Sequence, residues 1–266
     1  MKKGKSPANS TSWEKVADWY DQLVGDEGSD YHKNLINPGA IRMLAPGKGE
    51  KILDLACGQG VFCRELAKQG ADVIGIDSSK KLIELAKKRS PENIKYIVLN
   101  AADMRSFQPE TFDAVTCIMA IQNIDPLNIM INEVGRVLKI GGRFLIVLSH
   151  PCFRVPKQSN WGFDNRKHVQ YRRIDRYMTD IKAPIKMHPG YDPGQITYTF
   201  HRPLSEYFKV LRSSPSTSLG AGSLAVIGLE EWVSHRTSKP GSRQRSENHA
   251  RAEIPLFMAI LAKKMV

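Results

Sequence analysis

The sequence is poor in cysteine and has no long apolar run. Its four cysteines are Cys57, Cys63, Cys117 and Cys152, and no two of them form a C-x-x-C pair. Zinc is therefore not expected, and neither are disulfides in a chain without a secretory signal. The first ten residues, MKKGKSPANS, lack the apolar centre of a signal peptide. No apolar stretch approaches the roughly 20 residues that cross a bilayer. We predict a cytoplasmic protein with reduced thiols, no metal site and no membrane insertion.

Two common nucleotide-binding motifs are also missing. No Gly-Lys-Ser/Thr follows the small-residue turn at 56–60, so the P-loop is excluded. A dinucleotide fold uses G-x-G-x-x-G. Counting from Ala56 puts Val61 in the place of the third glycine, and counting from Gly58 puts Cys63 there. A dehydrogenase is therefore a distant alternative, which titration with NAD would test.

Residues 51–77, KILDLACGQGVFCRELAKQGADVIGID, read as a strand, a tight turn, a helix and a second strand. Glycines in the turn let the backbone approach a ligand closely, because they carry no Cβ. Ligands of open parallel sheets bind beyond the carboxyl ends of the strands. Asp77 ends the second strand, where an acid can accept hydrogen bonds from two ribose hydroxyls. This order predicts a site for a nucleoside-containing cofactor.

The segment D-L-A-C-G-Q-G resembles the first motif of class I S-adenosylmethionine-dependent methyltransferases, usually D-x-G-x-G-x-G. Ala56 replaces the first glycine of that motif. The segments that follow keep the order of the family: a third strand at 94–99 followed by NAADM, the strand FDAVTCI at 112–118, and NEVGRVLKIGGRFLIVL at 132–148. The whole chain resembles small-molecule methyltransferases of the UbiE-like, "type 11" kind.

The resemblance implies S-adenosyl-L-methionine as the cofactor. It places the ribose hydroxyls on Asp77 and the methionine part of the cofactor against the turn at 56–60. It also places the adenine amine on Asp103, with Met104 packed on the ring, and a tyrosine of the pre-core segment over the cofactor. The residues that it implies for cofactor binding are Tyr20, Asp54, Ala56, Cys57, Gly58, Gly60, Asp77, Ser78, Ala102, Asp103, Met104 and Met119.

The alternation of strands and helices predicts an α/β, Rossmann-like fold. We expect helices at 12–24, 60–69, 79–89, 126–139 and 203–212, and strands at 51–56, 72–77, 94–99, 112–118, 142–148, 224–229 and 253–263. By resemblance, the sheet has seven strands and is mostly parallel, with helices on both faces and an antiparallel strand seven between strands five and six. The expected parts are an N-terminal tail and helical cover (1–48), a cofactor-binding core (49–149), a substrate lid (150–202) and the C-terminal completion of the core (203–266), with a flexible insertion at 213–223.

The lid region, 150–202, has little periodicity and is rich in aromatic and basic residues. We expect it to be irregular and to carry the substrate contacts. Histidine is the usual general base near neutral pH. His150 follows the fifth strand directly, and His201 precedes the helix at 203–212. Each is a candidate catalytic base or substrate anchor, and a purely structural role is the alternative for both.

The net charge of +12 is unevenly placed. Residues 1–150 contain 20 Lys and Arg against 18 Asp and Glu, whereas residues 151–266 contain 19 against 9. The densest basic run, 236–251, is punctuated by Ser, Gly and Pro, as in a loop. We predict a small-molecule methyl acceptor, no specific nucleic-acid binding, and a monomer or homodimer. The alternatives are an RNA or protein methyltransferase that uses the basic half, and a non-catalytic cofactor-binding protein.

Overall fold

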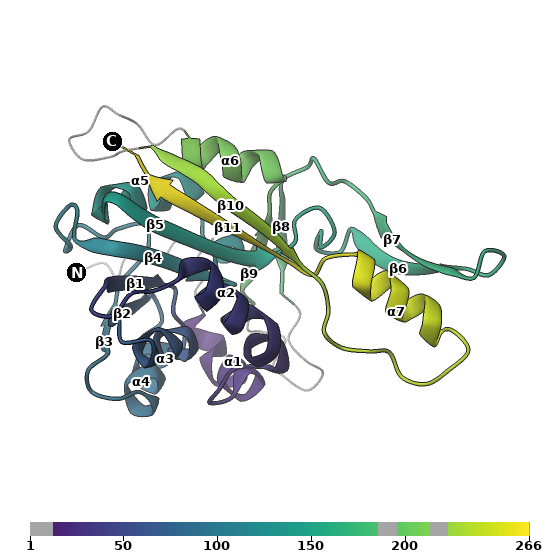
Figure 1. The fold of residues 1–266 in the computed structure, drawn as a ribbon, viewed down its shortest axis with the longest axis horizontal. Coiled ribbons are helices and arrows are strands. Elements are labelled where there is room, and N and C mark those ends of the chain that lie inside the picture. Colours follow the sequence, from purple (N-terminus) through teal and green to yellow (C-terminus); the bar gives the residue numbers. More distant parts are fainter. Residues whose placement is uncertain (1–12, 186–195, 213–222, 266) are drawn as a thin grey trace, which may run out of the picture.

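The computed structural model describes residues 13–185, 196–212 and 223–265. Its centre is a seven-stranded sheet in the order β10-β11-β5-β4-β1-β2-β3 (Figure 1). The strands are β1 (Lys51–Leu55), β2 (Asp72–Asp77), β3 (Lys95–Val98), β4 (Phe112–Ile118), β5 (Leu138–Ser149), β10 (Leu224–Trp232) and β11 (Phe257–Lys264). Strands β1 to β5 are parallel to their neighbours among themselves, and β11 runs antiparallel between β5 and β10. The predicted fold class and the place of the last strand are confirmed.

The sheet is buried on both faces, which is why its central strands read as continuous apolar runs. Along β5, Phe144 and Ile146 pack into one core cluster, and the alternate residues Leu145 and Val147 pack into the other. The first cluster is covered by α5 (Leu127–Val137) and α6 (Leu204–Arg212), and the second by α2 (Asn37–Leu44), α3 (Val61–Lys68) and α4 (Lys80–Arg89). Successive side chains along one strand therefore pack against helices on opposite faces of the sheet.

The N-terminal segment lies over the carboxyl ends of the parallel strands. It comprises η1 (Glu14–Val16), α1 (Ala17–Val24) and the π-helical turn η2 (His32–Ile36) that leads into α2. Glu14 accepts hydrogen bonds from Ser79 Oγ at 2.6 Å and from the Lys81 backbone N–H at 3.1 Å. These contacts attach the segment to the start of α4. The tail predicted before residue 13 lies outside the described residues.

Two expectations about the second half of the chain are wrong. Residues 150–202 are not irregular throughout, because they contain the antiparallel hairpins β6 (Ser159–Asp164) with β7 (Val169–Ile174) and β8 (Ile181–Pro184) with β9 (Tyr198–His201). The basic run at 236–251 is not all loop, because it includes most of α7 (Gln244–Glu253). Only Ala250 of α7 is buried, so the helix lacks the apolar stripe that would have identified it.

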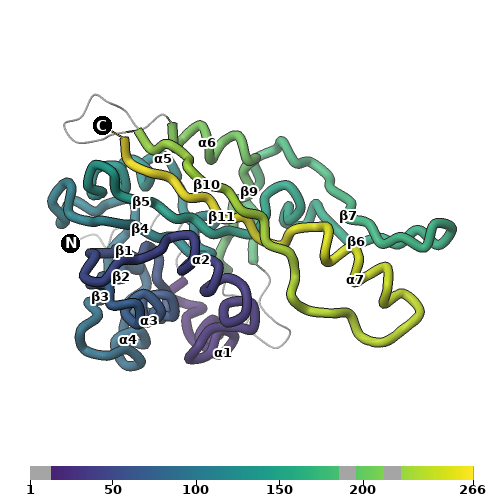
Figure 2. The backbone as a smooth tube through the Cα atoms, viewed as in Figure 1, coloured from purple at the N-terminus to yellow at the C-terminus, as the bar shows by residue number. Residues whose placement is uncertain are grey.

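The β6–β7 hairpin and α7 together form a lobe that projects from the sheet, and the tube trace follows their path (Figure 2). Arg243 lies over the ring of Phe163 at 4.3 Å, and Ser246 Oγ donates a hydrogen bond to the His168 carbonyl. The strand predicted at 253–263 begins later, at Phe257, because α7 extends to Glu253. Most of the predicted insertion at 213–223 lies outside the described residues.

Candidate functional site

The turn between β1 and α3 is held in a left-handed conformation. Ala56, Gly58 and Gly60 have φ values of 50°, 57° and 83°. Glycine adopts this region without steric cost, whereas alanine loses about 1–2 kcal/mol there. A Cβ on Gly58 would lie 3.3 Å from the ring of Tyr20. The turn is therefore packed directly beneath the N-terminal cover.

Asp77, at the end of β2, fixes this turn. Its Oδ2 accepts a hydrogen bond from the Gly58 N–H at 3.0 Å, and its Oδ1 accepts one from the Ser79 N–H at 2.8 Å. Burial raises the pKa of this carboxyl, and these two backbone donors act against the rise. An ionised carboxylate offers about four lone-pair positions. The positions that these donors leave free can accept from a ligand.

Asp54 lies beneath the turn. Its carboxylate accepts hydrogen bonds from Thr116 Oγ1 at 2.7 Å and from Cys63 Sγ at 3.3 Å. Burial raises its pKa to about 6, and these two donors oppose the rise. Asp54 thus links β1, β4 and α3 and does not face a cavity.

A cavity of about 490 Å³ opens beyond the carboxyl ends of β1, β2 and β4. We call it the sheet-end cavity. Six of the implied cofactor residues line it: Tyr20, Ala56, Gly58, Asp77, Ser78 and Met119. Ten more residues line the cavity that the resemblance did not imply: Trp13, Leu82, Leu99, Asn100, Ala101, Ile118, Ala120, Asn123, Ile124 and Asp125. The implied residues that lie outside the lining are Asp54, Cys57, Gly60, Ala102, Asp103 and Met104.

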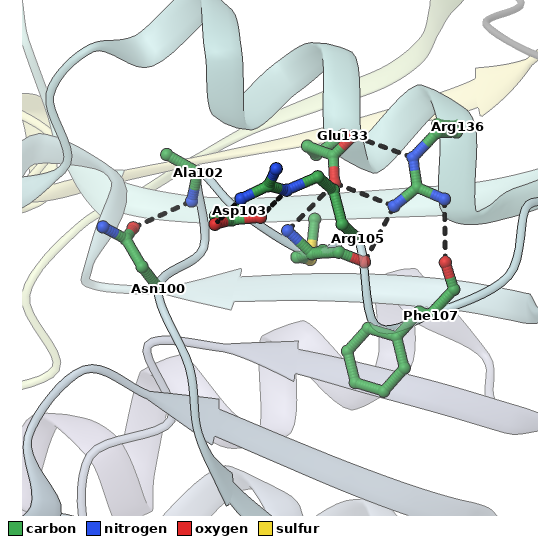
Figure 3. A network of polar contacts seen from close by, with 8 residues as sticks. Asn100, Ala102, Asp103, Arg105, Phe107, Glu133 and Arg136 are labelled. Atoms are coloured by element: carbon green, nitrogen blue, oxygen red, sulfur yellow. Dashed lines mark hydrogen bonds and ion pairs between the residues drawn. The ribbon is translucent and has the colours of Figure 1, made fainter.

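The segment after β3 explains why Asp103 and Met104 lie elsewhere (Figure 3). Both carboxylate oxygens of Asp103 accept hydrogen bonds from Arg105, at 2.7 and 2.8 Å, on the exposed side. Met104 is fully buried in the core, and its N–H donates to Glu133 at 2.9 Å. Asn100 reaches the cavity instead, and its Oδ1 accepts from the Ala102 N–H at 2.9 Å.

A second cavity, of about 370 Å³, adjoins the first. We call it the lid cavity. Both cavities are lined by Trp13, Tyr20, Met119 and Asn123. The remaining walls come from the N-terminal cover, the segment after β5 and the strand β9, with α6 behind them. The two cavities therefore share a wall at the end of β4, where Met119 has a φ of 56°.

The two candidate histidines lie in different surroundings. His201 lines the lid cavity, and its Nε2 donates to the Tyr177 carbonyl at 2.7 Å, so Nδ1 is the acceptor atom of the neutral ring. His150 lines neither cavity. Its Nδ1 accepts from the Cys152 N–H at 3.3 Å and its Nε2 donates to Glu231 at 2.6 Å. Burial lowers the pKa of His150, against the effect of Glu231. The expectation that His150 lies on the pocket side is therefore wrong.

A second histidine of the lid cavity, His32, was not identified from the sequence. His32 begins η2, and its Nδ1 pairs with Ser29 Oγ at 2.8 Å. Burial lowers the pKa of His32 and favours the neutral imidazole. Its position beside Tyr31, in the segment predicted to cover the cofactor, was the only available signal.

Among the described residues there is no cluster of three or more His, Cys, Asp or Glu that could hold a metal ion. Nor does the described part include a helix with the length and apolarity to cross a membrane.

Comparison with known proteins finds relatives of the central part of the chain. Residues 53–146 match the family model described as "Methyltransferase domain" (Methyltransf_11). Over 145 residues, 51% of the chain, it is 32% identical to a ubiquinone biosynthesis O-methyltransferase of Aliivibrio fischeri, covering 60% of that protein. Over 156 residues, 57% of the chain, it is 35% identical to the ubiquinone/menaquinone biosynthesis C-methyltransferase UbiE of Zymomonas mobilis, covering 61% of that protein. The chain thus spans about three-fifths of the length of these curated relatives.

Solved structures have the same fold over most of the chain. An S-adenosylmethionine-dependent methyltransferase from Mesorhizobium loti superposes with a TM-score of 0.67 at 24% identity, covering 90% of this chain and 100% of that one. At this identity the likeness supports the fold alone. Residues 53–146, which include the turn and Asp77, are therefore the part of the chain that is similar to the methyltransferase domain of this family and to these relatives.

Proposed function

We propose that this chain transfers a methyl group from S-adenosylmethionine, bound in the sheet-end cavity, to a small molecule bound in the lid cavity. The observation that carries the proposal is the wall shared by the two cavities, formed by Trp13, Tyr20, Met119 and Asn123. A methyl donor on one side of that wall and an acceptor on the other would lie next to each other at the carboxyl ends of the strands. Ligands bind at this edge in open α/β sheets.

The residues of the sheet-end cavity fit the parts of this cofactor. The free acceptor positions of Asp77 match the ribose hydroxyls, and the turn at 56–60 offers close backbone approach to the methionine part. Leu82 and Leu99 supply apolar walls, and Asn100 is the polar side chain at the end of β3. We therefore assign the adenine side to Asn100 and Ala101, in preference to Asp103 and Met104.

The cofactor supplies a methyl group activated by a cationic sulfur, and the protein supplies position and proton transfer. Holding the two reactants in line contributes roughly 7–11 kcal/mol in well-oriented systems. His201 is our candidate proton acceptor, because it lines the lid cavity and its Nε2 is held by the Tyr177 carbonyl, which makes Nδ1 the acceptor atom of the neutral ring. Tyr20 and Trp13 cover the shared wall and exclude water, which strengthens electrostatic interactions in the site.

The size of the lid cavity favours a small acceptor over RNA or protein. Its volume of about 370 Å³ falls in the range of about 300–1,000 Å³ of small-molecule sites. The relatives described above are named for ubiquinone and menaquinone biosynthesis, whose acceptors are small molecules too. A cytoplasmic location and a monomer or homodimer remain predictions.

The test is titration of the purified protein with S-adenosylhomocysteine and, separately, with NAD. We expect micromolar binding of the first and none of the second. Incubation with methyl-labelled S-adenosylmethionine and a panel of small phenols, amines and acids should then give a labelled product. Labelling of RNA or protein, with none of the small molecules, would instead support the alternative acceptor class.

A further inference from the structure

Two arginines and two histidines are among the residues of the lid cavity, and its described lining has no acidic side chain. The described residues that line it include Arg154, Arg202, His32 and His201, and none of them is Asp or Glu. The rest of the lining is mostly apolar, with Leu23, Val24, Ile185, Phe200 and two prolines among its members. A cavity of this composition is electrostatically suited to an anion with an apolar body.

Arg154 has no counter-ion among the described residues. Its guanidinium lies 6.0 Å from the ring centroid of Trp161 and makes no hydrogen bond or ion pair within the described part of the chain. Its neighbour Arg172 is already engaged, since it donates to the Phe153 carbonyl at 2.9 Å and to Ser159 Oγ at 2.7 Å. Burial lowers the pKa of Arg154 to about 10, and the charge of Arg172 acts in the same direction. A half-buried cation in this state gains most from an incoming carboxylate.

Within the described part of the chain, three further polar atoms on this cavity have no hydrogen-bond partner. Arg202 donates from Nη2 to the Ile124 carbonyl at 2.9 Å and to Asp125 at 2.8 Å, but its buried Nη1 has no acceptor within the described residues. Gln122 Oε1 and Asn123 Oδ1 are likewise buried without a donor in the described structure. Buried polar atoms are normally hydrogen-bonded, so unsatisfied ones in a cavity indicate what a ligand should offer.

Arg154 and one of the unpaired acceptors, Asn123, differ in the cavities that they line. Gln122 donates from Nε2 to the Met119 carbonyl at 2.8 Å, which turns its Oε1 away from that contact. Asn123 belongs to the wall shared with the sheet-end cavity, whereas Arg154 lines only the lid cavity. A ligand that satisfies both ends carries a hydroxyl at the shared wall and an anionic group at Arg154.

Building on the proposed function, we propose that the methyl acceptor is a hydroxycarboxylic acid with an apolar body. Its carboxylate pairs with Arg154, and its hydroxyl donates to Asn123 or Gln122 on binding and rotates towards Nδ1 of His201 for the transfer. In the transfer, the hydroxyl oxygen forms a bond to the methyl carbon as the carbon–sulfur bond breaks. The electron pair of that bond stays on sulfur, and the hydroxyl proton passes to Nδ1 of His201. The products are a methyl ether and S-adenosylhomocysteine.

The probes are 3-(4-hydroxyphenyl)propanoate and a panel of larger aromatic and alkyl hydroxy acids, each paired with its neutral amide. Binding is measured by calorimetry on the protein saturated with S-adenosylhomocysteine. We expect at least one acid to bind about tenfold or more tightly than its amide, because a charge-assisted hydrogen bond is lost in the amide. The best acid should give a methyl ether when S-adenosylmethionine replaces S-adenosylhomocysteine.

Arg154→Gln should weaken the best acid about 10- to 100-fold and leave its amide and S-adenosylhomocysteine unaffected. Arg154→Lys keeps the charge but loses the planar donor pair, so its effect should be intermediate. Arg166→Gln is the matched control, since Arg166 is exposed at the β6–β7 turn and lines neither cavity, and it should bind like wild type.

The inference is overturned if amides bind as tightly as acids, if Arg154→Gln keeps wild-type affinity for the best acid, or if no acid binds the cofactor-product complex. A phosphate monoester that binds more tightly than every carboxylate also overturns it. These outcomes leave the proposed function standing as long as S-adenosylhomocysteine binds. Failure of S-adenosylhomocysteine itself to bind wild-type protein is the separate result that removes the proposed function.

Discussion

Replacement of Asp77 by alanine is the sharpest test of the cofactor site. In the folded chain this carboxylate accepts from the N–H groups of Gly58 and Ser79, and we assign its free positions to the ribose. Hydrogen bonds to a charged group contribute about 1.5–3 kcal/mol each. Water that enters the space left by the side chain can replace part of this binding free energy. We therefore expect Asp77→Ala to weaken binding by about 1–3 kcal/mol, or roughly 5- to 150-fold.

The same change should also lower the free energy of unfolding. It leaves two backbone N–H groups in the turn without their acceptor, and each unsatisfied buried donor costs about 1–3 kcal/mol. Asp77→Asn does not repair this, because one of its two terminal atoms is an NH₂ group that would face a backbone donor. Both variants are expected to unfold at lower denaturant concentration than wild type.

Calorimetric titration with S-adenosylhomocysteine is the assay, with circular dichroism as the check on folding. Asp103→Ala is the matched control, because it removes the same charge from a half-exposed carboxylate that pairs with Arg105. Its affinity should stay within about twofold of wild type, since exposed ion pairs contribute little. A folded Asp77→Ala protein with wild-type affinity would refute the ribose assignment. A large loss in Asp103→Ala would restore Asp103 as the adenine contact.

Three further predictions concern neighbouring residues. Gly58→Val should reduce cofactor affinity more than tenfold in the same titration, because residue 58 has a φ of 57°, which disfavours any side chain, and the new Cβ would lie 3.3 Å from Tyr20. Normal binding would show that the turn does not touch the ligand. Asp54 has a folded pKa of about 6, above its unfolded value, so its protonated form stabilises the fold and this contribution fades as pH rises from about 4 to 6. Denaturation at pH 5 and pH 7 should therefore show a stabilisation at the lower pH that Asp54→Asn lacks, and an identical pH response would contradict the raised pKa. His201→Gln should lower turnover with unchanged cofactor affinity, whereas His150→Gln should change stability alone; the reverse pattern in kcat would exchange their roles.

The parallel core was predictable because its signals are local. Mostly apolar strands of five and six residues, with Asp54 near the end of the first and Asp77 at the end of the second, flank a glycine turn and a helix, and these local residues specify the strand, turn and helix. Ser79 caps α4 through its hydroxyl, which accepts from the Leu82 N–H at 3.2 Å. The lobe of β6, β7 and α7 gave no such signal, because its elements are stabilised by contacts between distant segments, such as Arg243 on Phe163.

Site residues could be predicted only where a regular strand or turn fixes their position in the fold. Asp77 and Gly58 lie at fixed points of the strand–turn unit, so their position in the sequence already puts them at the cavity. Asp103 lies three residues beyond Asn100 in an irregular segment, and nothing local shows that its carboxylate turns towards Arg105. His150 has the same difficulty, because its partner Glu231 is 81 residues away in the chain.

Backbone strain is placed where the two cavities meet the sheet. Ala56 and Met119 have φ values of 50° and 56°, and both line the sheet-end cavity at the ends of the adjacent strands β1 and β4. A non-glycine residue in this region costs about 1–3 kcal/mol and persists only where its surroundings hold it. Cys57 N–H donates to the Ile76 carbonyl at 2.9 Å, and Met119 N–H donates to the Val147 carbonyl at 2.7 Å, so each bend is held by a hydrogen bond to a neighbouring strand. Because both bends are held by hydrogen bonds within the protein, the sheet itself fixes the backbone where the cavities meet it, and the proposed binding sites need no ligand to hold that shape.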